Sequence, residues 1–137
     1  MPKLILMVGL PRSGKSTWAK TTGYPIVNRD SIRLALHGEA YLQKAESLVT
    51  IIEDCMVEAL ILAGHDKIII DACHTTPKRR ERWLNSDKWN IEYKVIPTIA
   101  TVCLIRAKEN NRPELIPIIE HMAKDWDLTG IYTKRED

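Results

Sequence analysis

The sequence predicts a small, doubly wound three-layer α/β domain, with a mostly four-stranded parallel sheet flanked by helices. Two observations along the chain indicate this fold. Short runs rich in isoleucine and valine recur, as parallel strands buried on both faces require, and segments with a helical spacing of apolar residues separate them. A third observation is the length: 137 residues suit one compact core, so we expect a single domain over residues 1–137.

The elements can be placed in chain order. Strands are expected at residues 3–8, 25–28, 67–72 and 91–96, and helices at 14–21, after Asp30, at 42–63, after a Thr76 cap with Pro77 in the first turn, at 100–110 and at 115–126. Residues 129–137 are expected to form a loosely held end. The clearest pattern is that of 42–63, whose expected buried face is Ala45, Leu48, Val49, Ile52, Cys55, Met56, Ala59, Leu60 and Ala63.

The composition is that of an ordinary globular domain, with 45% hydrophobic and 28% charged residues. A net charge of +2 is less basic than that of proteins that coat duplex DNA, although it suits transient contact with an anionic substrate. The three cysteines lie far apart without CxxC spacing, which argues against zinc and disulfides and favours the cytoplasm. The opening MPKLILMVGL is too short to span a membrane and predicts a buried strand, so no membrane partner is expected.

The segment GLPRSGKS, from Gly9 to Ser16, matches the pattern G-x-x-x-x-G-K-[ST] between a predicted strand and a predicted helix. This is the pattern of a P-loop, whose backbone N–H groups cradle phosphates. Lys15 would reach the β and γ phosphates of ATP or another NTP, and the Ser16 hydroxyl would bind Mg²⁺. We expect nucleotide contacts at Gly9, Pro11, Arg12, Ser13, Gly14, Lys15, Ser16 and Thr17. The alternative, a degenerate loop that only fills a turn, is disfavoured by the intact lysine and serine.

A second group of polar residues, NRDSIR, follows the second strand. Asp30 and Arg33 are three residues apart at a helix start, so their side chains can share one face. A kinase that acts on a hydroxyl needs a carboxylate to accept its proton and a cation to orient the acceptor. The residues alone leave an alternative open, in which Asp30 is only the N-cap and Arg33 an exposed helical residue.

A third group follows the third strand. Asp71 ends that strand, where a carboxylate can act on magnesium through a water or position the acceptor. His74 is a cap, a core polar group or a substrate contact. The basic residues Lys78, Arg79, Arg80 and Arg82 come next, and they are either a phosphate-binding surface or a solvated face. Further on, Arg106 and Arg112 bracket a stretch, residues 107–111, that can form a mobile lid whose arginines neutralise charge on a transferring phosphoryl group.

Together these motifs resemble the 5′-kinase domain of bacteriophage-type polynucleotide kinases. The segments GLPRSGKSTW, NRDSIR and IIIDACHTTPKRRERW and the arginine-bearing lid occur in the family's order and approximate spacing, from Met1 to about Gly130. The resemblance implies a three-layer P-loop kinase fold and NTP-dependent phosphorylation of the 5′-hydroxyl end of DNA or RNA, as in nucleic-acid end repair. It also implies the host cytoplasm, if the chain is phage-encoded.

Carried over by position, the resemblance implies a role for each site residue. Lys15 and Ser16 would bind the donor phosphates and the metal, Asp30 would be the general base, and Arg33 would contact the acceptor's 3′-phosphate. Asp71 would lie on the acceptor side, with Arg106 and Arg112 as lid arginines. His74 departs from the pattern, since many relatives have an asparagine there, and the position of the second lid arginine is open.

Two further functions compete with this one. A kinase of similar fold could phosphorylate a small hydroxylated metabolite, a nucleoside or an antibiotic, and would not need the basic residues 78–82. An NTP-binding switch or motor ATPase would transfer phosphate only to water, but the chain has no obvious second acidic residue next to Asp71.

Overall fold

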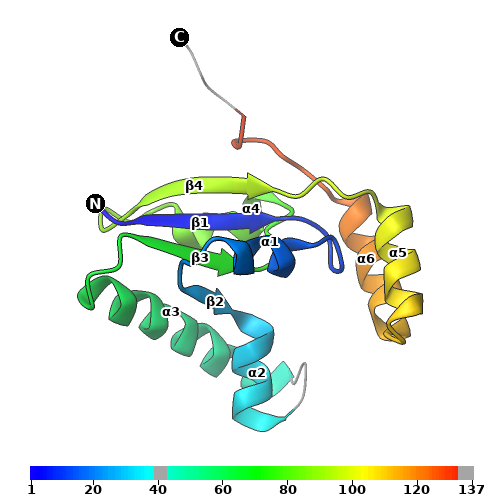
Figure 1. Cartoon of the computed structure of the whole chain (residues 1–137), viewed down its shortest axis with the longest axis horizontal. Coiled ribbons are helices and arrows are strands. Elements are labelled where there is room, and N and C mark those ends of the chain that lie inside the picture. Colours follow the sequence, from blue (N-terminus) through cyan, green and yellow to red (C-terminus); the bar gives the residue numbers. More distant parts are fainter. Residues whose placement is uncertain (39–42, 133–137) are drawn as a thin grey trace.

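The computed structural model describes residues 1–38 and 43–132, which form a parallel sheet with helices around it (Figure 1). The strands are β1 (Lys3–Val8), β2 (Ile26–Asn28), β3 (Lys67–Asp71) and β4 (Asn90–Val95). The α-helices are α1 (Lys15–Thr21), α2 (Arg29–His37), α3 (Glu46–Leu62), α4 (Pro77–Arg80), α5 (Ala100–Glu109) and α6 (Ile116–Lys124). Three short 3₁₀ turns, η1 (Gln43–Ala45), η2 (Glu81–Trp83) and η3 (Pro113–Leu115), adjoin α3, α4 and α6. The predicted fold class is confirmed.

The strands are ordered β2-β3-β1-β4 and every neighbouring pair is parallel. All four carboxyl ends therefore lie at one edge of the sheet, where ligands bind in folds of this kind. Asn28 stands opposite Asp71 in the register, and Gly9 N donates to Cys73 O at 3.1 Å. The pairing thus brings the starts of all three sequence motifs to the same edge.

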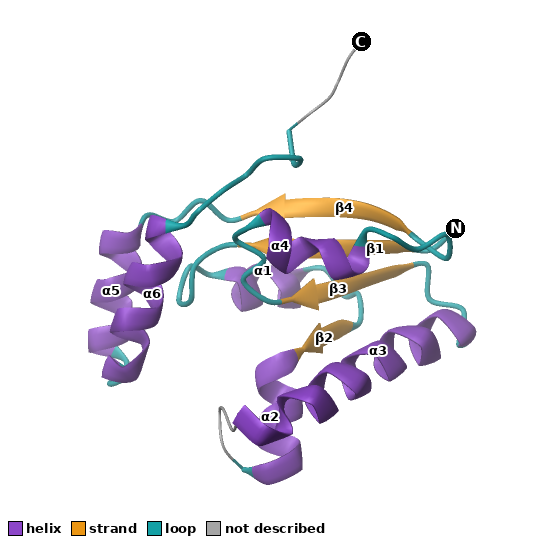
Figure 2. Ribbon diagram, turned by 180° about the vertical axis from the view of Figure 1, so that it is seen from behind, coloured by secondary structure: helices purple, strands orange, loops and turns teal. Residues whose placement is uncertain are grey.

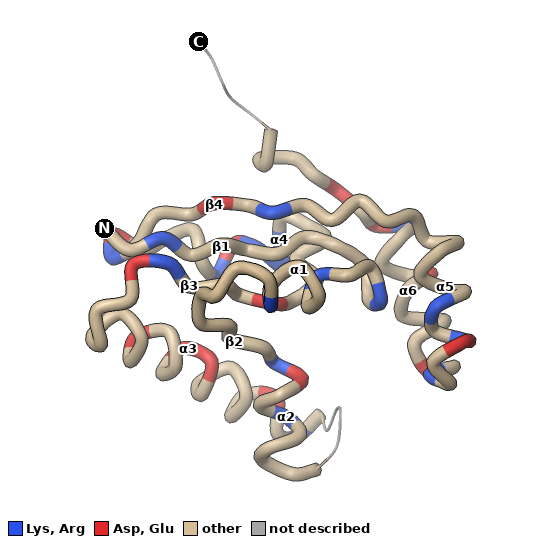
Figure 3. Tube along the Cα trace, in the orientation of Figure 1, with Lys and Arg blue, Asp and Glu red and all other residues tan. Residues whose placement is uncertain are grey.

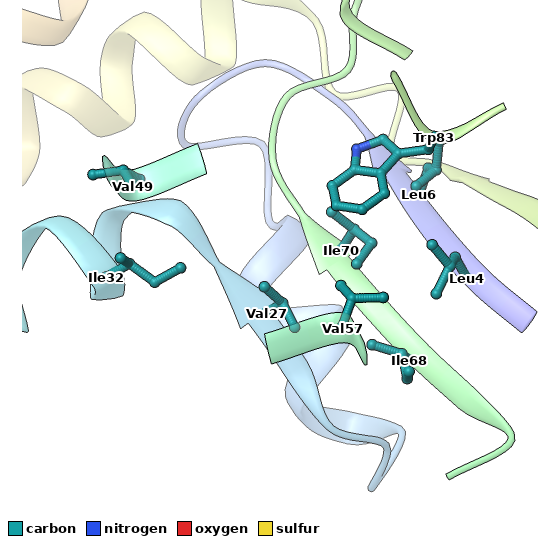
Figure 4. Packing of buried hydrophobic residues seen from close by; sticks show 9 residues of the cluster. All are labelled: Leu4, Leu6, Val27, Ile32, Val49, Val57, Ile68, Ile70 and Trp83. Atoms are coloured by element: carbon teal, nitrogen blue, oxygen red, sulfur yellow. The ribbon is translucent and has the colours of Figure 1, made fainter. Parts of the chain in front are cut away.

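The alternation of side chains along β1 and β3 supplies a core on each face of the sheet. On one face, Leu4, Leu6, Ile68 and Ile70 pack with residues of α3 and with Trp83 (Figure 4). On the other, Ile5, Met7 and Ile69 pack with Ala19 of α1. The helices accordingly separate, with α3 and α4 on one side and α1 on the other (Figure 2). This is the expected three-layer arrangement.

The buried face of α3 differs from the one that the sequence predicts. The residues of α3 that are buried are Val49, Glu53 and Val57. Leu48 and Met56, which were expected inside, are 48% and 36% exposed. The helix instead turns Glu53 inward, where its carboxylate pairs with Arg29 and Arg82. Residue 42, the expected start of this helix, lies outside the described residues, as does the end of the tail from residue 133.

Helices α5 and α6 cover neither face of the sheet but lie side by side beyond its carboxyl edge (Figures 1 and 2). They enclose a separate core of Leu10, Cys103, Ala107 and Ile119. Because Leu10 belongs to the predicted P-loop, this helix pair is packed directly on the phosphate-binding segment. None of the described helices is long and apolar enough to cross a bilayer.

Candidate active site

The loop between β1 and α1 has the geometry of a phosphate cradle. Gly14 has φ 105° and Arg12 has φ 66°, so the backbone curls back on itself before α1 begins. A Cβ at Gly9 would lie 2.7 Å from Ser13 Oγ and 3.1 Å from Ile96 O, so no side chain fits there. The first turn of α1 receives no side-chain cap from the described residues, and its N–H groups are available to an anion.

The side chains of the loop fit a triphosphate with its metal. Ser13 Oγ is buried and has no hydrogen-bond partner among the described residues, although buried polar atoms are normally paired. Lys15 is 8% exposed and its Nζ donates to Leu10 O at 2.8 Å, which holds the ammonium over the loop. A triphosphate on the loop would find one fixed cation and one unsatisfied hydroxyl.

Ser16 and Asp71 form a pair of hard oxygen donors suited to magnesium. Ser16 Oγ donates to Asp71 Oδ2 at 2.7 Å, and Asp71 is 5% exposed at the end of β3. Mg²⁺ in kinases takes one or two protein oxygens and completes its octahedron with phosphates and waters. The described residues offer no cluster of three acidic, histidine or cysteine side chains that would make a dedicated metal cage. Ser16, with Asp71 beside it, is the place where Mg²⁺ would be held.

Asn28, which sequence reasoning did not assign to the site, joins the second motif to the third. Its Nδ2 donates to Asp71 Oδ2 at 3.0 Å, and its Oδ1 accepts from Ser31 N at 2.8 Å. Asn28 is therefore the N-cap of α2, so the alternative in which Asp30 is only the cap is wrong. An asparagine at the end of a strand and before a helix is a cap signal that could have identified it.

Asp30 and Arg33 lie together on α2, as their spacing predicts. Arg33 Nη1 donates to Asp30 Oδ1 at 2.7 Å, and the Asp30 side chain is 71% exposed. The same guanidinium also donates to both carboxylate oxygens of Glu46, at 2.9 and 2.7 Å. The hydrogen bond from Arg33 lowers the pKa of Glu46, so that glutamate is ionised. Arg33 is thus held in a fixed orientation, not free as an exposed helical residue would be.

A buried carboxylate on α3 connects two further arginines to this site. Glu53 is 1% exposed and Oε1 accepts from Arg29 at 2.7 Å and from Arg82 at 2.5 Å. Arg29 also reaches Glu46 at 3.2 Å. Figure 3 shows acidic positions recurring along α3 and basic and acidic positions in succession at the start of α2. Glu46 and Glu53 were missed from the sequence because their partners are far away in the chain.

The basic run after β3 divides into residues with different surroundings. Arg80 is 1% exposed and donates to the backbone oxygens of His74, Asp127 and Thr129, so it is part of the fold, not of a basic surface. Arg82 is paired with Glu53 and Asp54 and lies over the Trp83 ring, 4.2 Å from its centroid. Lys78 and Arg79 are exposed. Both interpretations of the basic run, a solvated face and a phosphate-binding surface, are therefore wrong for Arg80.

His74 is a buried structural group. Its Nδ1 lies 2.8 Å from Met7 O, and burial lowers its pKa to about 4. The neutral ring then donates from Nδ1 to the Met7 carbonyl at the end of β1. His74 has φ 38°, a conformation that side chains rarely adopt, at the turn that follows Asp71.

The two lid arginines occupy different places. Arg106 Nη1 donates to Arg12 O at 3.1 Å, and the Arg12 guanidinium donates in turn to Asn110 Oδ1. Arg112, between α5 and α6, pairs with Glu114 at 2.6 Å. Arg106 is thus tied to the phosphate loop, whereas Arg112 lines the cleft described next. Movement of this segment stays a prediction.

These groups meet in one cleft of about 660 Å³, which we call the central cleft. Its wall includes the P-loop residues Pro11, Arg12, Lys15 and Ser16. Its other charged and polar lining residues come from the second and third motifs, from α3 and from the lid: Asn28, Arg29, Asp30, Arg33, Glu53, Asp71, His74, Arg79, Arg82 and Arg112. A phosphate cradle, a carboxylate and several cations therefore share one space, which is what transfer of a phosphoryl group to an acceptor requires.

Comparison with known proteins gives one family and a larger set of similar solved structures, of which three follow. The sequence model of a family described as AAA domain matches residues 4–116, which include every candidate site residue. Two solved structures are titled "Structure of Pnkp1/Rnl/Hen1 complex" and "Structure of the Pnkp1/Rnl/Hen1 RNA repair complex". The first match has a TM-score of 0.68 and 29% identity over 77% of this chain, and the second a TM-score of 0.68 and 20% identity over 99%.

This chain spans 38% and 52% of the chains that it matches in those two complexes. A third relative, a gluconokinase from Sinorhizobium meliloti 1021, has a TM-score of 0.57 and 16% identity over 96% of this chain and 79% of its own. All three share the fold of this chain, and the third is named as a kinase of a small metabolite.

Proposed function

Because this chain belongs to the AAA domain family and is a polynucleotide-kinase-like P-loop domain, we propose that it is a polynucleotide 5′-hydroxyl kinase. It would transfer the γ phosphate of ATP or another NTP to the 5′-hydroxyl end of DNA or RNA. The resemblance indicated by the motifs is confirmed at the level of the domain, and its kinase-type fold implies NTP binding. The acceptor, the metal and the roles of individual residues belong to the proposal.

One observation carries the proposal: the carboxylate of Asp30 and the cations Arg33 and Arg79 line the same cleft as Lys15 and Ser16. A carboxylate beside a phosphate cradle can accept a hydroxyl proton, and cations beyond it suit an acceptor that carries its own phosphates. A neutral metabolite would give the exposed Arg79 no anion to bind, whereas Arg33 already donates to Asp30 and Glu46. The titles of the Pnkp1 complexes, one of which names RNA repair, support the same acceptor class.

The proposed reaction follows from these positions. Asp30 Oδ1 accepts from Arg33, while Oδ2 is available to take the proton of the acceptor's 5′-hydroxyl. The freed oxygen attacks the γ phosphorus, the bond from that phosphorus to the β–γ bridging oxygen breaks, and the NDP leaves. Lys15 and Arg112 line the same cleft, and in this proposal they neutralise the charge on the transferring group. Ser16, with Asp71 beside it, would hold Mg²⁺, which when bound would supply further neutralisation of the phosphate charge.

The test is phosphate transfer from several γ-labelled NTPs to 5′-hydroxyl oligonucleotides, free nucleosides and polyols. We expect transfer to oligonucleotides and its loss, by at least about a hundredfold, in Asp30→Asn, since a general base supplies roughly 10²–10⁴ in rate. Binding of the NTP should change little. Asp87→Asn is the matched control, because Asp87 is exposed and does not line the central cleft. Full activity of Asp30→Asn would contradict the role of Asp30, and transfer to polyols or to water alone would contradict the acceptor class.

A further inference from the structure

A second cavity, of about 600 Å³, lies beside the short edge strand β2 between α1, α2 and α3. We call it the β2-edge cavity. Its volume is in the range that holds small organic molecules. It is lined by six apolar side chains, Ile26, Ile32, Ala35, Leu36, Ile52 and Met56.

The β2-edge cavity meets the central cleft at the candidate catalytic residues. Ser16, Asn28, Asp30 and Asp71 line both. No residue from 9 to 15 lines the β2-edge cavity. The cavity therefore adjoins Ser16 and the carboxylates of Asp30 and Asp71, and it does not adjoin the rest of the P-loop. A group bound in it would therefore sit on the acceptor side of Asp30.

Six of the twelve lining residues are apolar and six are polar, which suits a body with apolar faces and a polar edge. Leu36 and Met56 are 41% and 36% exposed even though they face a concave surface, and apolar side chains exposed in a hollow mark a binding site. Polar groups, such as Ser31 and Lys20, occur among the lining residues as well. A polyol would have to give up the hydration of its hydroxyl groups against isoleucine and methionine, which is costly. A nucleobase would bury its faces and keep its polar edge near Ser31 and Lys20.

We propose that the β2-edge cavity binds the base of the acceptor's 5′-terminal nucleoside, an inference that rests on the proposed function. Asp30 is the junction: a nucleoside with its base in this cavity would present its 5′-hydroxyl to Asp30, and its 3′-phosphate would point to Arg33 in the central cleft. Because packing of a base against the apolar side chains does not depend on its pattern of donors and acceptors, this contact would be open to any of the bases.

The test compares acceptor oligonucleotides with and without a base at the 5′-terminal nucleotide. In the wild-type chain the abasic acceptor should have a KM at least about fivefold higher, because the apolar contact of the base with the cavity is lost. Ala35→Trp, which fills the cavity from α2, should raise the KM of the normal acceptor and remove the difference between the two. Met56→Glu, on α3, should act in the same direction.

Leu34→Trp is the matched control, since Leu34 is 55% exposed on the same helix and lines neither cavity; it should keep the wild-type preference. NTP affinity and circular dichroism of each variant show whether the fold and the donor site are intact. If the abasic and normal acceptors behave alike in the wild type, or if Ala35→Trp keeps the preference, the base binds elsewhere and the proposal is overturned while the proposed function stands. If no oligonucleotide is phosphorylated at all, both fail.

Discussion

Replacement of Glu53 by glutamine should destabilise the protein well beyond what an ordinary surface charge change does. The Glu53 side chain is 1% exposed and its Oε1 accepts from two arginines whose side chains are 20% and 31% exposed. Removing one partner of a fully buried ion pair costs about 3–5 kcal/mol. The arginines here are partly hydrated, and Arg29 and Arg82 keep Glu46 and Asp54 as partners, so we expect about 2 kcal/mol.

Thermal unfolding measures this effect. A loss of about 2 kcal/mol in a domain of this size lowers the Tm by roughly 6–8 °C. Glu58→Gln is the control on the same helix: Glu58 pairs with Lys88 at 2.8 Å, but the two side chains are 44% and 59% exposed, and exposed pairs contribute about 0–1 kcal/mol. Its Tm should fall by no more than roughly 4 °C. Equal shifts in the two variants would refute the argument that burial makes Glu53 the centre of the network.

Three further predictions concern the P-loop and the turn after β3. Gly9→Ala places a Cβ 3.1 Å from the backbone oxygen of Ile96 and should weaken NTP binding at least about tenfold, as measured by titration; unchanged affinity would contradict the tight cradle. His74 has a folded pKa of about 4 against 6.5 unfolded, so the unfolded state binds more protons between these values and stability falls by up to about 3 kcal/mol as the pH drops from 6.5 to 4. The dependence of the free energy of unfolding on pH, measured by urea unfolding, should become weaker in His74→Gln and stay the same in the exposed His121→Gln. The same pH dependence in the wild type and both variants would contradict this prediction. Arg80→Lys loses its bonds to Asp127 and Thr129 and should cost about 1–3 kcal/mol, with little change in the neighbouring, exposed Arg79→Lys; similar melting curves would show that Arg80 is not needed there.

Features with a local cause could be predicted from the sequence. The P-loop follows from glycines and a lysine at fixed spacing, and the strands follow from continuous apolar runs. The pairing of Asp30 with Arg33 depends only on helical periodicity and is confirmed at 2.7 Å. Each of these features is set by residues close to one another in the chain.

Features that depend on distant residues could not be predicted. Glu53 meets Arg29 and Arg82 across 24 and 29 residues of the chain. The prediction of the face that α3 buries was wrong in part. The spacing of apolar residues does not show that the helix turns a glutamate inward to pair with arginines. The burial of Arg80 has the same origin, because its acceptors at Asp127 and Thr129 are carbonyls of a segment that approaches only in the folded chain.

Asn28 shows why one amide can fix the geometry of the whole site. Its Oδ1 accepts from Ser31 N and starts the helix that carries Asp30, while its Nδ2 donates to the carboxylate of Asp71 next to Ser16. Aspartate and serine both cap helices well, but an ionised aspartate has no donor and would place a second negative charge against Asp71. Serine is too short to reach both partners. The requirement for a donor and an acceptor on one rigid group therefore favours asparagine. Through these two hydrogen bonds Asn28 couples the position of Asp30, the proposed base, to that of the proposed metal site.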